Sequence, residues 1–119
     1  MKVGVLTAFC HDRDFEDMIK YLHDIGVQAV ELASGGYPGK YHINPEKLLK
    51  APEKIAEIKA VIDKYGMEIS AVSAHGNPVH PDKATAKKYH DDFINAILFA
   101  QKLGVDTIVG FSGCPGDPD

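Results

Sequence analysis

The stretch Tyr21-Leu-His-Asp-Ile-Gly-Val-Gln-Ala-Val-Glu-Leu32 decides the fold, because the chain repeats its pattern twice more. The matching stretches are Val61-Ile-Asp-Lys-Tyr-Gly-Met-Glu-Ile-Ser-Ala-Val72 and Phe99-Ala-Gln-Lys-Leu-Gly-Val-Asp-Thr-Ile-Val-Gly110. All three align on a glycine with apolar residues on either side, and these glycines lie 40 and 38 residues apart. A fixed period of this length indicates a fold built from repeated supersecondary units.

Each unit combines a helix with a strand. Before each glycine the apolar residues recur at three and four positions, as on one face of a helix, and the glycine suits the left-handed residue past a helix end. After it comes a short run rich in Val and Ile, typical of a strand buried on both faces, and Val3-Gly4-Val5-Leu6 opens the chain in the same way. The pattern predicts strands at about 3–8, 27–33, 68–74 and 106–111, and helices at about 14–25, 53–65 and 84–103.

Local signals refine the helices. Asp12 or Asp14 suits the first N-cap, and Asn44 before Pro45 predicts a capped turn at 45–50 that Pro52 separates from the next helix. On the last helix we expect a packed face made of Tyr89, Phe93, Ile97, Ala100 and Leu103.

Strands that alternate with helices pair in parallel through right-handed crossovers. We therefore expect an α/β fold with one parallel sheet in the order 1-2-3-4. A (β/α) barrel needs eight such units and typically about 250 residues, whereas this chain has 119. The loop Phe111–Asp119 follows the last strand without a covering helix. We interpret residues 1–119 as one partial domain, the amino-terminal half of a TIM barrel with four strands and three helices.

The composition excludes several classes of protein. The hydrophobic fraction of 45% argues against disorder, and only two cysteines in 119 residues argue against a disulfide scaffold. The two cysteines also lack the paired spacing of a metal site. The net charge is −4 and the positive charges are scattered, which disfavours nucleic acid or an anionic membrane as partner. No apolar run approaches the roughly 20 residues of a membrane span, and we see no signal peptide. We expect free thiols and a cytoplasmic protein.

Three segments carry a resemblance to a known family. Val30-Glu-Leu32, Ser70-Ala-Val-Ser-Ala-His-Gly-Asn77 and Ala100-Gln-Lys-Leu-Gly-Val-Asp-Thr-Ile-Val109 resemble the xylose isomerase-like barrel family, which includes sugar phosphate isomerases and epimerases and the apurinic endonucleases. The resemblance covers essentially the whole chain, but only the family's amino-terminal half. It implies that the divalent metal and the acid-base carboxylates come mostly from later strands, beyond Asp119.

Ligands of parallel α/β sheets bind beyond the carboxyl ends of the strands, which selects the candidate site residues. His75 follows five small or apolar residues, and the resemblance places a pocket-lining histidine here; the alternatives are a bond to loop backbone or, less favoured, a metal ligand. Glu31 stands among apolar neighbours and must find a partner, whether a substrate hydroxyl or a neighbouring amide. The remaining substrate-binding candidates are Asn77, Ser112, His11 and Phe9, and we expect Tyr37 and Tyr41 to fold over the pocket. We assign no catalytic residue and no metal ligand within the chain.

The resemblance implies a fragment of a metal-dependent isomerase or epimerase acting on a small sugar, sugar acid or sugar phosphate. Such a fragment would be inactive alone, because the essential carboxylates would lie beyond Asp119. One alternative is a non-catalytic half-barrel that self-associates or binds a partner through its open sheet edges. A second alternative, an apurinic endonuclease-type nuclease, is disfavoured because the stretch Val109–Cys114 contains no histidine.

Overall fold

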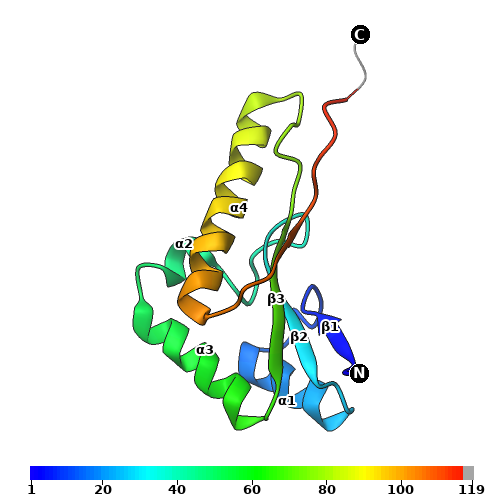
Figure 1. Cartoon of the computed structure of the whole chain (residues 1–119), viewed down its shortest axis with the longest axis vertical. Coiled ribbons are helices and arrows are strands. Elements are labelled where there is room, and N and C mark those ends of the chain that lie inside the picture. The colour runs from blue at the N-terminus through cyan, green and yellow to red at the C-terminus, as the bar shows by residue number, and fades with distance from the viewer. Residues whose placement is uncertain (117–119) are drawn as a thin grey trace.

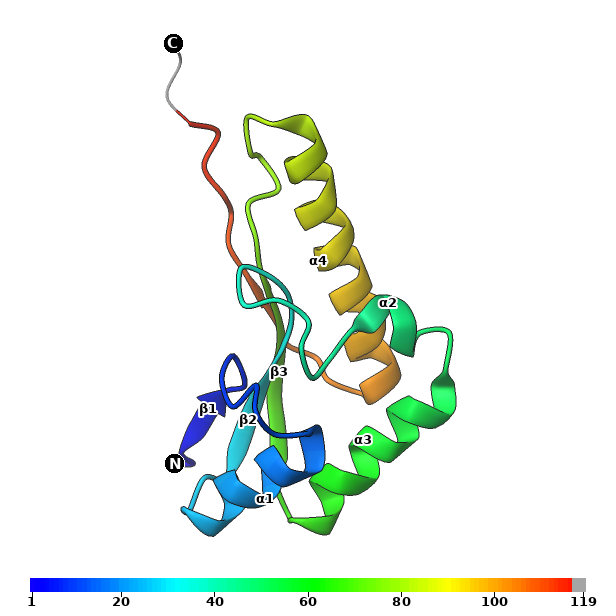
Figure 2. The same cartoon turned by 180° about the vertical axis from the view of Figure 1, so that it is seen from behind.

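A computed structural model describes residues 1–116 as a parallel sheet with helices along one side of it (Figure 1). The sheet has the order β1-β2-β3-β4, and every neighbouring pair is parallel, as predicted. Figure 2 shows the same arrangement from behind, with β1 at one edge. The elements are β1 (Gly4–Leu6), α1 (Phe15–Asp24), β2 (Ala29–Gly36), α2 (Pro45–Leu48), α3 (Pro52–Lys64), β3 (Glu68–His75), α4 (Lys83–Leu103) and β4 (Ile108–Gly110).

The structure departs from the expected elements in two ways. It has four helices rather than three, because the turn predicted at 45–50 closes into the short helix α2. The strands β1 and β4 have three residues each, shorter than predicted, because each pairs with only one neighbour. The loop expected over Phe111–Asp119 leaves β4 without secondary structure as far as residue 116, and its last three residues lie outside the described part.

The predicted caps define where the helices begin. The Asp14 carboxylate accepts the N–H of Asp17 at 2.9 Å, so Asp14 rather than Asp12 caps α1. Asn44 caps α2 with Pro45 at the first helical position, and Asp82 caps α4. The three aligned glycines follow α1, α3 and α4 with φ of +91°, +61° and +77°, the left-handed conformation that the repeat predicts.

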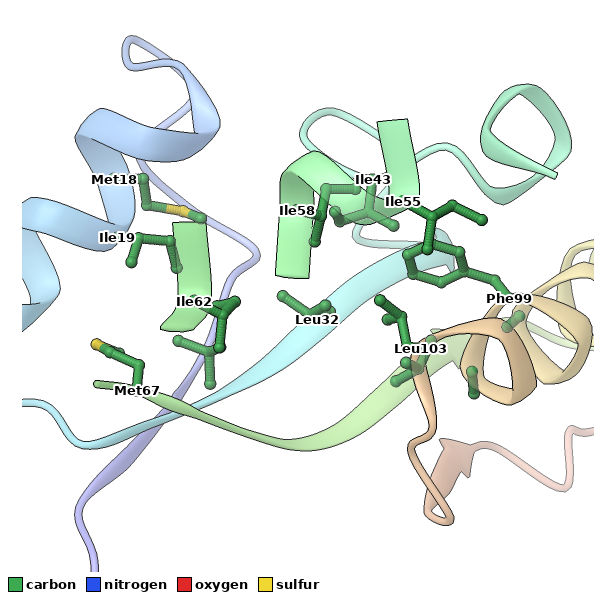
Figure 3. Packing of buried hydrophobic residues seen from close by; sticks show 14 of the residues in the cluster. Met18, Ile19, Leu32, Ile43, Ile55, Ile58, Ile62, Met67, Phe99 and Leu103 are labelled. Carbon is green, nitrogen blue, oxygen red and sulfur yellow. The ribbon is translucent and has the colours of Figure 1, made fainter. Parts of the chain in front are cut away.

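The core fills the space between the sheet and the helices (Figure 3). Leu32 of β2 lies near its centre, with Met18 and Ile19 of α1 on one side and Phe99 and Leu103 of α4 on the other. The fully buried Val30 and Leu32 belong to this core, so the alternation along a strand directs Glu31 to the opposite face of the sheet. In a closed barrel that opposite face is the interior.

The packed face of α4 differs from the one expected. Ile97, predicted to be packed, is 40% exposed, and Ile94 and Leu98 beside it are 42% and 44% exposed. The apolar residues of α4 form two stripes, and the described chain covers only the one that meets the sheet and α2. The buried positions are Asp92, Ala96, Phe99, Ala100 and Leu103. Within residues 1–116 no helix has the length and apolarity needed to cross a bilayer.

Candidate functional site

Glu31 of β2 and His75 of β3 meet on the face of the sheet that the helices leave open. The Oε1 atom of Glu31 lies 3.8 Å from Nε2 of His75, and their side chains are 26% and 13% exposed. This distance is too long for a direct hydrogen bond, but it is short enough for both groups to contact the same bound molecule. A carboxylate and an imidazole together can accept and donate hydrogen bonds to the hydroxyls of a polar ligand.

Irregularities in the pairing of β2 with β3 accompany this juxtaposition. The register shifts once between Val30 and Glu31 and again between Ala33 and Gly36, so that Glu31 pairs with Ala71 and Gly36 pairs with His75. Bulges of this kind bend a strand and redirect its side chains, and they are common next to active sites. The sequence selected both polar residues but gave no sign of these shifts.

The loop that follows β2 is attached to the main chain of His75. Gly36 has a φ of +76°, and a Cβ there would lie 2.2 Å from the carbonyl carbon and oxygen of His75. The N–H of Tyr37 then donates to the same carbonyl oxygen at 2.8 Å. The site histidine is therefore held from its neighbouring strand as well as from its own.

An aromatic side chain, Phe111, lies beside the Glu31–His75 pair. The ring of Phe111, directly after β4, lies 4.8 Å from the ring of His75 between centroids, although Phe111 remains 56% exposed. Phe111 was not among the residues predicted from the sequence, and the available signal was its apolar side chain at the end of a predicted strand. Aromatic faces beside hydrogen-bonding groups are common in ligand pockets.

Phe111 also borders a hollow of about 450 Å³ beyond the strand ends. The predicted residues Asn77 and Ser112 line it, and so does Tyr37, whose ring lies tilted against that of Tyr89 of α4 with 5.2 Å between centroids. Of the two tyrosines expected to fold over the pocket, Tyr37 lines this hollow and Tyr41 does not. The hollow and the Glu31–His75 pair thus share Phe111.

Asn77 joins two loops. Its Nδ2 donates to the carbonyl oxygen of Cys114 at 2.7 Å, and its Oδ1 accepts the N–H groups of Cys114 at 3.0 Å and Val79 at 3.2 Å. The amide is thereby committed to holding the loop after β4 against the loop after β3. Asn77 therefore lines the hollow, but its amide is already used in bonds to the two loops.

His11 and Phe9 lie in the loop after β1, and among the described residues no hydrogen bond, ion pair or ring interaction joins them to the Glu31–His75 pair. His11 stacks on Tyr41 with 4.7 Å between ring centroids, and His42 lies edge-on to Tyr41 at 4.9 Å. Phe9 is 36% exposed. His11, Tyr41 and His42 form a second aromatic group, in the loops after β1 and β2.

Cation ligands are few in the described part of the chain. Residues 1–116 contain no group of three or more His, Cys, Asp or Glu side chains arranged to hold a metal ion. Glu31 and His75 offer two donors between them, fewer than the four to six protein and water ligands that divalent ions take. These residues do not make a metal site on their own.

Comparison with known proteins assigns the chain to a family. The family model described as "Xylose isomerase-like TIM barrel" matches residues 19–119, which is most of the chain. The chain belongs to the xylose isomerase-like TIM barrel family. Its four parallel strands and the face that carries Glu31 and His75 are therefore part of such a barrel.

Relatives of this barrel segment are longer proteins. The uncharacterized protein YfiH of Bacillus subtilis strain 168 is 31% identical over 120 residues, a match that spans 100% of this chain and 38% of YfiH. The chain thus spans little more than a third of the length of this curated relative.

Three solved structures are similar in fold. The apo 3-keto-D-glucoside 4-epimerase of E. coli has a TM-score of 0.62 at 14% identity over 91% of this chain and 36% of its own. The D-psicose 3-epimerase of Clostridium cellulolyticum H10, crystallised with D-tagatose, has a TM-score of 0.62 at 21% identity, covering 92% and 37%. The probable 3-DHS dehydratase of Bacillus anthracis has a TM-score of 0.60 at 18% identity, covering 95% and 39%.

Proposed function

We propose that this chain forms the amino-terminal part of a metal-dependent isomerase or epimerase acting on a small sugar, sugar acid or sugar phosphate. The observation that carries the proposal is the convergence of Glu31, His75 and Phe111 on the inner face of a parallel barrel segment. Two of the fold neighbours are, by their names, sugar epimerases, which supports this choice among the activities that the fold hosts. A cytoplasmic location is part of the same proposal.

In this proposal the chain binds and orients substrate. The imidazole of His75 hydrogen-bonds a substrate oxygen, Glu31 accepts from a neighbouring hydroxyl, and the Phe111 ring packs against the apolar face of the sugar. Ser112, Asn77 and Tyr37 form a wall of the pocket. His11 and Phe9, in the loop after β1, would meet the substrate from the side of that loop in the closed barrel.

Isomerisation and epimerisation beside a carbonyl remove a proton and return it elsewhere, which calls for an acid and a base. A divalent ion supplies electrostatic stabilisation of the developing enediolate when it is bound. Glu31 and His75 do not hold such an ion alone, and we propose that its ligands and the acid-base carboxylates lie beyond Asp119. It follows that the chain by itself has no turnover.

The test compares His75→Ala with His90→Ala, an exposed histidine of α4, in a protein that joins this chain to the later strands of the barrel that the proposal requires. Loss of a hydrogen bond to a polarised substrate oxygen costs about 1.5–3 kcal/mol of transition-state binding, or a fall of roughly 10- to 150-fold in kcat/KM. The melting temperature and bound metal should stay unchanged, and the His90→Ala protein should match the parent.

Two outcomes overturn the proposal. The first is a His75→Ala protein that loses melting temperature while its kcat/KM stays intact, because His75 would then act only on the fold. The second is isomerase or epimerase turnover by the isolated chain with added divalent metal, because the chemistry would then lie within these residues.

A self-associating half-barrel is a second candidate. In the described structure β1 and β4 each pair on one edge only, and Ile94, Ile97 and Leu98 form an exposed apolar stripe on α4. A second copy would supply four more parallel strands, giving the eight of a closed barrel.

Analytical ultracentrifugation of the isolated chain tests this candidate. Ile97→Glu should convert a dimer to a monomer, whereas Val79→Glu, at an equally exposed position in the loop after β3, should not. A chain that is monomeric before any substitution rejects the candidate.

A further inference from the structure

Asp92 is a buried carboxylate in the middle of α4. It is 4% exposed, and among residues 1–116 it is the buried side chain that carries a charge. Removing a carboxylate from water costs several kcal/mol unless hydrogen bonds and an opposite charge replace the lost hydration. Its partners therefore show what the burial achieves.

All of these partners belong to the segment that leaves β2. The ammonium group of Lys40 forms an ion pair with Oδ1 of Asp92, and the N–H of Gly36 donates to Oδ2 at 3.1 Å. Gly35 lies so close that a Cβ there would be 3.0 Å from the Cβ of Asp92. One carboxylate thus binds both ends of the segment Gly36–Lys40, hereafter the β2 loop.

The β2 loop connects Asp92 to the candidate site. Gly36 pairs in register with His75, and the N–H of Tyr37 donates to the carbonyl oxygen of His75. Asp92 and His75 therefore both contact Gly36, and Asp92 also holds Lys40 while His75 holds Tyr37. Tyr37, the residue after Gly36, also lines the hollow beyond the strand ends.

We infer that Asp92 is a positioning residue, which with Lys40 holds the β2 loop against the end of β3 and so fixes where Tyr37 and His75 stand. A buried ion pair is a costly way to gain stability, and an apolar pair of similar size often stabilises as well or better. Here the pair fixes the position of the β2 loop, because the two carboxylate oxygens of Asp92 bind the N–H of Gly36 and the ammonium group of Lys40. The importance of this for substrate rests on the proposed function; the positioning itself does not.

Amide hydrogen exchange of the isolated 119-residue chain, read by NMR, tests the inference. The double variant Lys40→Met with Asp92→Asn leaves no unpaired buried charge, so it should keep a melting temperature close to that of the wild type. The amides of Gly36 and Tyr37 should nevertheless exchange at least about tenfold faster, and the ring signals of His75 should shift. The core amide of Phe99 should be unaffected.

The adjacent pair provides a matched control. Asp91 and Lys87 form an exposed ion pair on the same helix, four residues apart. The double variant Lys87→Met with Asp91→Asn should leave both the β2 loop amides and the His75 signals unchanged. Lys40→Arg, which keeps the charge, should retain most of the protection that Lys40→Met loses.

Two results overturn the inference: unchanged exchange at Gly36 and Tyr37 in the Lys40→Met and Asp92→Asn double variant, or faster exchange spread evenly over loop and core. The first would show that the pair does not hold the loop, and the second that it serves only global stability. Since the readout is not turnover, a failed test of His75 as a substrate ligand would leave this result standing.

Discussion

Replacing Gly36 by alanine tests the contact between the β2 loop and His75 most directly. Gly36 has a φ of +76°, and an added Cβ would lie 2.2 Å from the carbonyl carbon and oxygen of His75 and 2.6 Å from the nitrogen of Gly76. All three are main-chain atoms, so no side chain can rotate away to make room. The loop must move off the end of β3.

Gly39 of the same loop is a matched control. Its φ is +79°, nearly that of Gly36, but a Cβ there meets nothing within 4 Å. Gly39→Ala should therefore cost only the left-handed conformation, about 1–2 kcal/mol of unfolding free energy. Gly36→Ala carries that cost and also loses the bond from Tyr37 to His75, worth about 0.5–1.5 kcal/mol, for a total of about 1.5–3.5 kcal/mol.

Urea unfolding of the 119-residue chain, followed by circular dichroism, measures both variants. We expect the loss for Gly36→Ala to exceed that for Gly39→Ala by at least the value of one hydrogen bond, and the ring signals of His75 to shift in the first variant only. Equal losses of stability, or an undisturbed His75 in Gly36→Ala, would refute the close contact described here.

Two further predictions concern α4. Phe99 is fully buried and Leu98 beside it is 44% exposed, so Phe99→Ala should lower the free energy of unfolding by about 3–5 kcal/mol and Leu98→Ala by less than about 1; similar losses in urea unfolding would contradict this packing. Hydrogen bonds from Thr85 hold the pKa of the Asp82 carboxyl below its ordinary 3.8, so the cap is fully present above pH 3.8 and is lost as the pH falls through the lower folded pKa. The melting temperature of Asp82→Ala should therefore lie below that of the wild type at pH 7 and approach it in acid, whereas a gap that does not vary with pH would show that the charge plays no part.

The sequence alone predicted the architecture because that architecture depends on local patterns. The glycine-centred repeat predicts three helix-to-strand units from the local sequence alone. Asp14 and Asn44 cap their helices by bonding the N–H groups of residues three positions further on. Glu31 and His75 were selected for a related reason, since polar residues within apolar strands need partners. Those parts of the fold and the site follow from periodicities of two and about 3.6 residues.

Tertiary structure alone decided which of these residues act together. Asp92 and Lys40 are 52 positions apart in the sequence and fall on a helix and in a loop whose patterns carry no sign of each other. Phe111 meets His75, and Asn77 binds Cys114, only because the pairing of β3 with β4 and the path of the loops beyond them bring these residues together. The face of α4 that packs was likewise set by what lies against it. A local pattern fixes which side of its own element a residue occupies, whereas contacts between distant elements depend on register and loop path, which no single segment encodes.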